Sequence, residues 1–526
     1  MRADWEALRS VSQAGSAHIV MVTSMRKNVF VAMVFLAILF SIVPVIWFSH
    51  LPLVDYPNHL AALQIRKTIS SNIHLARFYE FRWIFTPYLG LDLLVTPFLP
   101  FFSVDIAGRI VIILAFVMIY VGAILLDRQL NPKNWGLSIF AGIFLYNGAF
   151  KWGFINYIIG IGLAIIAFWI WVRYRDKIIG VSIVLFTVLG GIVCLMHLYA
   201  FAIYGVCVAG YECSVFWEKL RIERQLRMSL FKIPLRAAVS FLVPLLAVIW
   251  LSPMSSSHGP MVWGGPWEAP TFWDSLLRSK AEALASPIYF KYSAEKPLVF
   301  AMFAILVWAL ATRTLVVNSR MVIPLAAFGV IFMVIPSELL GAGLVDYRLP
   351  SGVAFFAWAS LGWGETSRAR INVVGLLLVF CLIVRVGSVL STWQPAQAII
   401  EEYDSALQSV PPGSRLLYVM DESGWSNPPL VHVPVLAAAK QGVFVPYTFT
   451  DDGWMVSGIQ LLKLMPGYRD YSDTRDAIYS INNIARFDYL LEIRNPQVKM
   501  PTGISLNEVA RGQTFTLYRI DQDGTK

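Results

Sequence analysis

Long apolar runs, separated by short polar stretches, fill most of the chain up to residue 391. A helix needs about 20 apolar residues to cross the hydrocarbon core of a bilayer, so each run predicts a membrane-spanning helix. The predicted spans are 29–49, 105–126, 135–150, 154–172, 178–196, 198–217, 234–252, 297–316, 321–336, 350–364 and 371–391. Several runs are short or adjoin one another. The pattern therefore predicts an all-α polytopic membrane bundle of about 11–13 transmembrane helices.

One apolar segment, 84–102, does not fit this scheme. It is interrupted by Pro87, Pro97 and Pro100 and carries Asp92. Because proline breaks a helix and a carboxylate is costly in lipid, we expect the segment to be re-entrant or interfacial. If it crosses the membrane instead, one further crossing is needed to keep the two chain ends on their predicted sides.

Positive charges orient the predicted bundle. Lys and Arg gather around residues 26–27, 173–177, 218–236 and 368–370, which all fall on one side. Cytoplasmic loops carry an excess of these residues, so this side and the N-terminal tail 1–28 are predicted to be cytoplasmic. The outer side then receives the loops 50–104, 253–296 and 336–349, the turns at 150–154 and His197, and everything after Trp393.

Two outer loops have distinctive compositions. Residues 59–81 have the pattern of one or two amphipathic helices at the membrane interface, with Arg66 and Arg77 toward lipid head groups. The loop 253–296 interleaves tryptophans such as Trp267 with proline and glycine. Such rings anchor to the interface, and they also suit a sugar face or a lipid chain.

The composition changes after Trp393. Residues 395–410 have a helical pattern, and 414–421, 487–494 and 515–520 are rich in β-branched and aromatic residues, which favours strands. We therefore predict three units. They are the cytoplasmic tail 1–28, a transmembrane module 29–392, and an extracytoplasmic α/β domain 393–526.

The overall composition agrees with a membrane protein. Hydrophobic residues make up 57% of the 526 residues and charged residues 14%, with a mean hydropathy of +0.62. The net charge of +9 is typical of cytoplasmic loops rich in Lys and Arg, so nucleic acid is not a predicted partner. The chain contains no phosphate-binding P-loop, dinucleotide fingerprint or HExxH motif.

The most informative polar stretch is LPLVDYPNHL at 51–60, directly after the first span. Pro57 suits the first turn of a helix, which places Asp55 and His59 one turn apart with Asn58 between them. An ionised carboxylate there suits a metal ligand or a hydrogen-bond acceptor for a nucleophile. The alternative is that Asp55 and Asn58 only cap an interfacial helix.

Three further candidates lie at two outer turns. His197 lies where two apolar runs meet, and Lys151 and Asn156 lie in GAFKWGFINYIIG. Ionisable groups at membrane depth usually face a cavity or a partner. The alternatives are a histidine bonded to a backbone carbonyl in a tight turn, and glycines that serve helix packing.

The last predicted outer cluster is PSELLGAGLVDYRLP, with Glu338, Asp346 and Arg348. An arginine at this place can bind two phosphate oxygens at once. The alternative is a local Asp346–Arg348 pair that only orients the loop. All these candidates fall on the outer face of the predicted topology, which favours a shared site.

These features resemble the polytopic C-type (GT-C) glycosyltransferases, which use lipid-phosphate sugars. The resemblance rests on VDYPNH at 54–59, the amphipathic helices behind it, the number of spans and the outer C-terminal domain. The motifs LYNGAFKWGFINYIIG, LMHLYAF and VDYRLP also resemble bacterial members of this group that have no assigned substrate.

The resemblance implies roles for the candidate residues. The first-loop acid of such enzymes is catalytic or activates the acceptor, and that role carries over to Asp55. A second acid, frequent in an adjacent outer loop of the family, has no match, since 150–154 offers Lys151. No metal ligand or cofactor is therefore assigned, and a divalent cation stays open. By our hypothesis Arg348, His197 and Lys151 stabilise the leaving phosphate, while Asn58 and His59 position groups around the acid.

The resemblance also implies the substrates and the location. The donor is a polyprenyl-phosphate sugar, with hexosyl or pentosyl transfer to a glycan, lipid or protein on the outer face of a bacterial inner membrane. One alternative is a transporter or flippase for a lipid-linked sugar, although we find no internal repeat in the chain. A second alternative is a membrane-anchored scaffold whose outer domain binds a partner.

Overall fold

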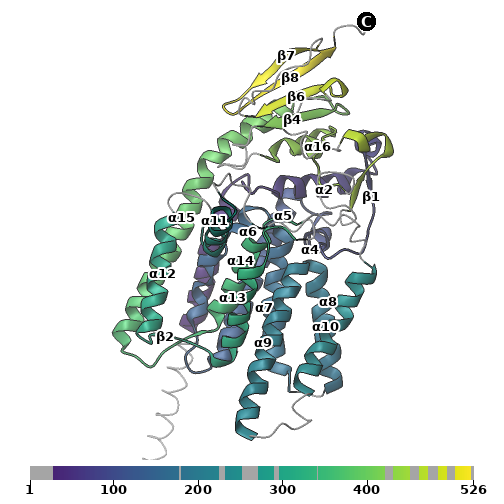
Figure 1. Cartoon of the computed structure of the whole chain (residues 1–526). Coiled ribbons are helices and arrows are strands. Elements are labelled where there is room, and N and C mark those ends of the chain that lie inside the picture. Colours follow the sequence, from purple (N-terminus) through teal and green to yellow (C-terminus); the bar gives the residue numbers. More distant parts are fainter. Residues whose placement is uncertain are drawn as a thin grey trace, which may run out of the picture.

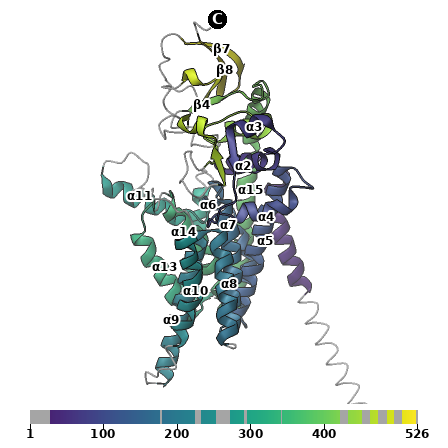
Figure 2. The ribbon, with the colours of Figure 1, turned by 90° about the vertical axis from the view of Figure 1, so that its right-hand side faces the viewer.

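The computed structural model describes residues 28–176, 179–223, 232–251, 263, 271–289, 295–339, 342–420, 431–450, 461–471, 484–493 and 504–522. Long helices run side by side in one bundle, and the C-terminal strands lie beyond one end of it (Figures 1 and 2). Two predicted segments lie mostly outside the described residues. They are residues 1–27 of the predicted tail 1–28 and most of the aromatic loop 253–296, including Trp267.

Five helices in the described residues are long and apolar enough to cross a membrane. They are Asn28–Trp47, α5 (Val104–Leu130), α7 (Ile155–Tyr174), α9 (Leu198–Glu223) and α15 (Arg368–Leu407). The other predicted spans correspond to α8 (Ile179–Met196), α10 (Lys232–Leu251), α12 (Glu295–Ala311), α13 (Val322–Val334) and α14 (Val345–Ala359). The predicted class, a polytopic helical membrane bundle, is confirmed.

The predicted span 135–150 is wrong as a single helix. The segment forms a 3-10 helix, η2 (Leu137–Phe144), followed by the short α6 (Gly148–Lys151). Asn147 separates the two, since its side chain accepts a hydrogen bond of 2.9 Å from the Phe150 amide and caps α6. The apolar run is explained by burial, because nearly all of its side chains lie inside the bundle.

The predicted loop 336–349 is also partly wrong, because α14 begins at Val345 and not at Pro350. The uninterrupted apolar run begins only after Asp346 and Arg348, which placed the expected start too late. The chain enters α14 through Leu344, whose φ of 57° is left-handed, and the Val345 amide donates to the Ser337 carbonyl. Asp346 and Arg348 therefore project from the first turns of a helix.

The segment 84–102 folds into α4 (Gly90–Val95) and the 3-10 helix η1 (Thr96–Phe98). At 1.5 Å per residue, neither is long enough to span a bilayer. The Arg66 guanidinium on α2 lies 2.9 Å from the Asp92 carboxylate on α4, which fastens the segment to α2.

The amphipathic helices predicted in that loop are α2 (Tyr56–Thr68) and α3 (Ile73–Phe78). They lead into β1 (Tyr79–Phe81), which pairs antiparallel with β5 (Leu462–Leu464). A strand of the first loop and one from the C-terminal part thus form a single small sheet.

The C-terminal part is built on a sheet with the order β4-β6-β8-β7. Strands β4 (Leu416–Met420) and β6 (Tyr489–Ile493) are parallel, whereas β8 (Phe515–Gln522) runs antiparallel to β6 and to β7 (Ile504–Arg511). Three of these strands match the predicted ones. The remaining elements are α16 (Leu436–Gln441), η6 (Val433–Val435), η7 (Pro466–Tyr471) and η9 (Ile484–Arg486). Helix α15 runs without a break across residue 393, so the predicted domain boundary lies inside a helix.

Further short elements complete the bundle. An antiparallel pair, β2 (Leu315–Val317) and β3 (Leu361–Trp363), lies at the end opposite the C-terminal sheet (Figure 1). The 3-10 helix η4 (Ser319–Met321) precedes α13, and α11 (Phe272–Ala285) packs against α14. Inside the bundle, Arg385 on α15 forms an ion pair with Glu295 on α12, and both side chains are fully buried.

Candidate active site

The turn at 151–154 holds the backbone of the first loop, at residues 54 and 55, in place. The Val54 amide donates to the Lys151 carbonyl at 3.0 Å, and the Asp55 amide donates to the Trp152 carbonyl at 3.1 Å. Gly153 adopts a left-handed φ of 79°, and a Cβ added there would lie 2.8 Å from the Asp55 nitrogen. Only glycine allows this close approach without strain.

Asp55 occupies the N-cap position of α2, but its side chain makes no capping hydrogen bond to that helix. The alternative that its carboxylate serves as a helix cap is therefore wrong. The side chain is 16% exposed, so it is accessible from outside while its backbone is fixed. This combination suits a carboxylate that acts on a bound molecule.

His432 is the partner that sequence reasoning missed. Its Nε2 lies 3.5 Å from the Asp55 Oδ1, and its side chain is fully buried. On its other side, Nδ1 lies 3.5 Å from the Tyr418 hydroxyl of β4. The stretch VHVPV carries no motif that could have pointed to this role, because only folding brings η6 onto α2.

Asn58 and His59 join the same region from α2. The buried Asn58 Oδ1 accepts a hydrogen bond of 3.2 Å from the Phe449 amide, so this side chain anchors the C-terminal part. The His59 ring lies edge-on to Phe449 at 5.4 Å. Burial lowers the pKa of His59, and the charge of Asp55 and a hydrogen bond to the Gly153 backbone oppose this only in part. His59 is thus a neutral imidazole at pH 7.

Arg348 is the second polar centre of the site. Its side chain is 8% exposed, and its guanidinium carbon lies 3.9 Å from the centre of the Phe154 ring and 5.4 Å from that of Tyr199. Within the described residues no carboxylate lies in ion-pair range of this guanidinium, and its Nε has no hydrogen-bond partner. A buried cation without a counter-ion is costly, so the arrangement favours an anionic ligand.

His197 supports the aromatic surroundings of Arg348. Its Nδ1 accepts a hydrogen bond of 3.2 Å from the Tyr199 amide, and its ring lies edge-on to Tyr88 at 4.9 Å and to Tyr157 at 5.2 Å. The Tyr157 hydroxyl in turn donates to the Arg348 carbonyl at 2.5 Å. His197 is therefore bonded to a backbone amide in the turn, and not to a backbone carbonyl as one alternative expected.

Asp346 does not pair with Arg348. Its Oδ2 accepts a hydrogen bond of 3.1 Å from the Ser279 hydroxyl and lies 3.8 Å from the Lys280 Nζ, both on α11. The alternative of a local Asp346–Arg348 pair is wrong, since helix positions two residues apart point in different directions. Asp346 instead fastens α11 to α14.

The remaining candidates have different surroundings. Asn156 accepts a hydrogen bond of 2.5 Å from the Leu91 amide and so binds the start of α4. The Lys151 side chain is buried behind the turn. Glu338 is partly exposed and precedes Leu339, whose carbonyl accepts a bond of 3.1 Å from the Tyr199 hydroxyl. The fold thus brings Asp55, Asn58, His59 and Lys151 together. Arg348 and His197 lie on the other side of the same turn. Asn156 and Asp346 have other partners.

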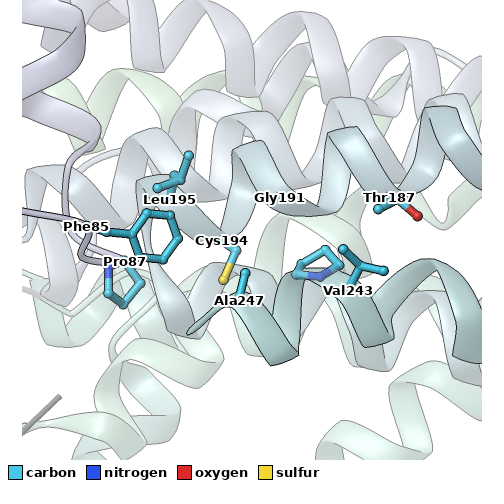
Figure 3. A pocket seen from close by; sticks show the side chains of 9 residues that line it. Phe85, Pro87, Thr187, Gly191, Cys194, Leu195, Val243 and Ala247 are labelled. Atoms are coloured by element: carbon cyan, nitrogen blue, oxygen red, sulfur yellow. The ribbon is translucent and has the colours of Figure 1, made fainter. Parts of the chain in front are cut away.

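An apolar pocket of about 170 Å³ opens beside this region (Figure 3). It is bounded by the segment around Phe85 and Pro87, by α8 near Cys194, and by α10 near Ala247. Tyr88, which follows Pro87, contacts the His197 ring. The pocket suits a hydrocarbon chain. In the part of the chain that the structure describes, no three His, Cys, Asp or Glu side chains are grouped so that they could hold a metal ion.

The fold was compared with those of known proteins. No family model matches the sequence, and no curated protein matches it. The structure is similar to the crystal structure of ArnT from Cupriavidus metallidurans in the apo state. The TM-score is 0.52 at 10% identity, covering 94% of this chain and 98% of that chain. The chain therefore has the fold of a polytopic GT-C glycosyltransferase.

Two further solved structures are more distant. The same ArnT bound to undecaprenyl phosphate gives a TM-score of 0.48 at 10% identity, over 94% of this chain and 98% of that chain. The arabinofuranosyltransferase AftD from Mycobacteria gives a TM-score of 0.46 at 11% identity. This match covers 95% of this chain but only 40% of AftD, so our chain spans less than half of that protein's length.

Proposed function

We propose that the protein is an integral-membrane glycosyltransferase that moves a sugar from a polyprenyl-phosphate donor to an acceptor hydroxyl. The transferred sugar is a hexose or a pentose, and the acceptor is a glycan, a lipid or a protein. The reaction takes place on the outer face of a bacterial inner membrane, the side that the charge distribution assigns to the first loop.

The observation that carries the proposal is the environment of Arg348. The buried guanidinium has no carboxylate partner among the described residues, and it stacks on Phe154. Residue 154 belongs to the same turn whose backbone holds Asp55. A cation suited to a phosphate and an accessible carboxylate are thus fixed by one short turn, as transfer from a sugar phosphate requires.

The reaction is a single displacement. Asp55 accepts the proton of the acceptor hydroxyl as its oxygen attacks the anomeric carbon of the donor sugar. The bond between that carbon and the phosphate oxygen breaks, and the electron pair leaves with the polyprenyl phosphate. Arg348 stabilises the charge that develops on this phosphate, which is an effect that usually dominates such sites.

The apolar pocket supports a lipid donor. Its walls are almost entirely hydrocarbon, and it lies between α8, α10 and the segment that ends at Tyr88 (Figure 3). Pro87 lines the pocket, and the next residue, Tyr88, contacts His197 beside the Arg348 group, so we place the polar end of a bound isoprenoid chain at this end of the pocket. We therefore assign the pocket to part of the donor's hydrocarbon chain.

Purified protein in lipid vesicles tests the proposal. It would be incubated with a panel of pentosyl and hexosyl polyprenyl phosphates and a bacterial envelope extract as the source of acceptors. Release of free polyprenyl phosphate, lost in Asp55→Asn and kept in Glu80→Gln, is the expected result. Glu80 is a suitable control, because it is a 38% exposed carboxylate of the same outer loop, paired with Arg82. Movement of intact donor between leaflets without release would overturn the proposal and support a flippase.

A further inference from the structure

His432 connects the C-terminal part of the chain to Asp55. Its imidazole is fully buried, with Nε2 at 3.5 Å from the Asp55 Oδ1 and Nδ1 at 3.5 Å from the Tyr418 hydroxyl. Tyr418 is also fully buried, on β4. One ring nitrogen thus faces the carboxylate, and the other faces a hydroxyl of the C-terminal sheet.

The chemistry of these groups defines the direction of the hydrogen bonds. A neutral imidazole has one donor and one acceptor nitrogen, and an ionised carboxylate only accepts. In the tautomer that carries its hydrogen on Nε2, this nitrogen faces the Asp55 carboxylate as a donor, and Nδ1 is left to accept from the Tyr418 hydroxyl. At 3.5 Å the Nε2–Oδ1 contact is not itself a hydrogen bond in this structure, and contacts of this kind tighten when substrate binds.

The surroundings hold this arrangement rigidly. The Phe449 ring lies 5.9 Å from that of His432 and 5.4 Å from that of His59, and its amide is bound by Asn58. The Tyr79 hydroxyl accepts from the Val445 amide at 3.2 Å, next to the β1–β5 pairing. The C-terminal part is therefore fastened to α2 on several sides of the carboxylate, as a positioning group needs.

We propose that His432 is a positioning residue that orients the Asp55 carboxylate through Nε2, with Tyr418 selecting the tautomer. The inference rests on the proposed role of Asp55. It explains how a carboxylate that does not cap its own helix keeps one orientation. It also makes the C-terminal part a component of the active site and not a separate module.

Two polar substitutions of the same residue test this. In His432→Gln the new side-chain amide reaches the place of Nε2, whereas in His432→Asn it reaches only the place of Nδ1. With a donor that the wild type turns over, we expect His432→Asn to lower kcat at least about 10-fold with little change in KM, since small displacements of a catalytic group are costly. His432→Gln restores most of the rate, Tyr418→Phe lowers it several-fold, and the exposed His74→Gln leaves it unchanged. Equal rates for the Asn and Gln variants would overturn the inference.

A second readout does not need activity. In thermal unfolding, the effects of Asp55→Ala and His432→Asn should be non-additive in the double variant, because contacting residues couple. Additive shifts in Tm overturn the inference whether or not a donor is found. Coupled shifts together with full activity of Asp55→Asn overturn only the proposed function. If His432→Asn does not fold, Tyr418→Phe provides both the kinetic test and the unfolding cycle.

Discussion

The guanidinium carbon of Arg348 lies 3.9 Å from the centre of the Phe154 ring. Two residues earlier in the chain, the Trp152 carbonyl accepts the hydrogen bond of the Asp55 amide. The cation and the carboxylate of the proposed reaction therefore both contact residues of one turn, although Arg348 lies on α14 and Asp55 at the start of α2. A change in this turn affects both groups.

Replacement of the proposed general base should abolish transfer with little effect on folding. Asp55→Asn keeps the size of the side chain but cannot take up a proton, so we expect kcat to fall by about 10²–10⁴-fold. Release of polyprenyl phosphate measures the effect, with Glu80→Gln in the same loop as the matched control. Wild-type rates in Asp55→Asn would exclude the proposed mechanism.

Two substitutions of Arg348 should separate the effect of its charge from the effect of its planar shape. Arg348→Gln removes the cation and is expected to lower kcat about 10²–10³-fold, the cost of losing one group that stabilises transition-state charge. Arg348→Lys retains the charge but not the planar stacking on Phe154, so its rate should lie between those of Gln and wild type. Equal activity of the Gln and Lys variants would show that the charge at this position does not act on the phosphate.

Gly153 should be essential for the geometry of the turn. Gly153→Ala places a Cβ against the Asp55 nitrogen and requires a left-handed φ, so we expect a loss of about 1–3 kcal/mol and a strong fall in activity. The control is Gly329→Ala on α13, where a Cβ meets nothing within 4 Å. That variant should be as stable as wild type or slightly more stable, because alanine favours helices. Tm and transfer rate are measured for both variants. Equal values for Gly153→Ala and Gly329→Ala would contradict the prediction.

His59 should contribute to the acid sensitivity of the fold. Burial lowers its pKa, so below about pH 6.5 the unfolded chain takes up a proton that the folded chain does not. The free energy of unfolding therefore falls as the pH falls from neutral to about 5. In His59→Gln the Tm should depend less on pH in this range. Burial also lowers the pKa of His50, so the difference between the two proteins, and not the slope itself, is the measured quantity. Parallel profiles would contradict the prediction.

The buried pair of Glu295 and Arg385 should stabilise the contact between α12 and α15. Neither side chain is exposed, so Glu295→Gln leaves a buried cation without its counter-ion and should cost about 3–5 kcal/mol. The double variant Glu295→Gln/Arg385→Met removes both charges and should recover part of this loss. Unfolding in detergent measures both, and a double variant less stable than the single one would contradict the argument.

The apolar pattern predicted the long membrane-spanning helices well. Helices α5, α7 and α9 begin within a residue of their predicted starts, because bilayer thickness requires a long apolar run. The pattern failed at 137–151, since a buried interior segment is just as apolar whether it forms one helix or several short ones. It also failed at the start of α14, where Pro350 lies inside the helix.

The sequence by itself determined the class of the protein, because long apolar runs carry that information. It also predicted the outer-face grouping of the polar residues and the choice of Asp55, and both stay predictions. Only the tertiary structure decided which candidates are neighbours. In the folded chain the Arg348 guanidinium stacks on Phe154, Asp346 lies in ion-pair range of Lys280, and His432 lies next to Asp55. These contacts join residues far apart in the chain. Their closeness depends on how helices, short strands and turns pack against one another, and no local pattern records that.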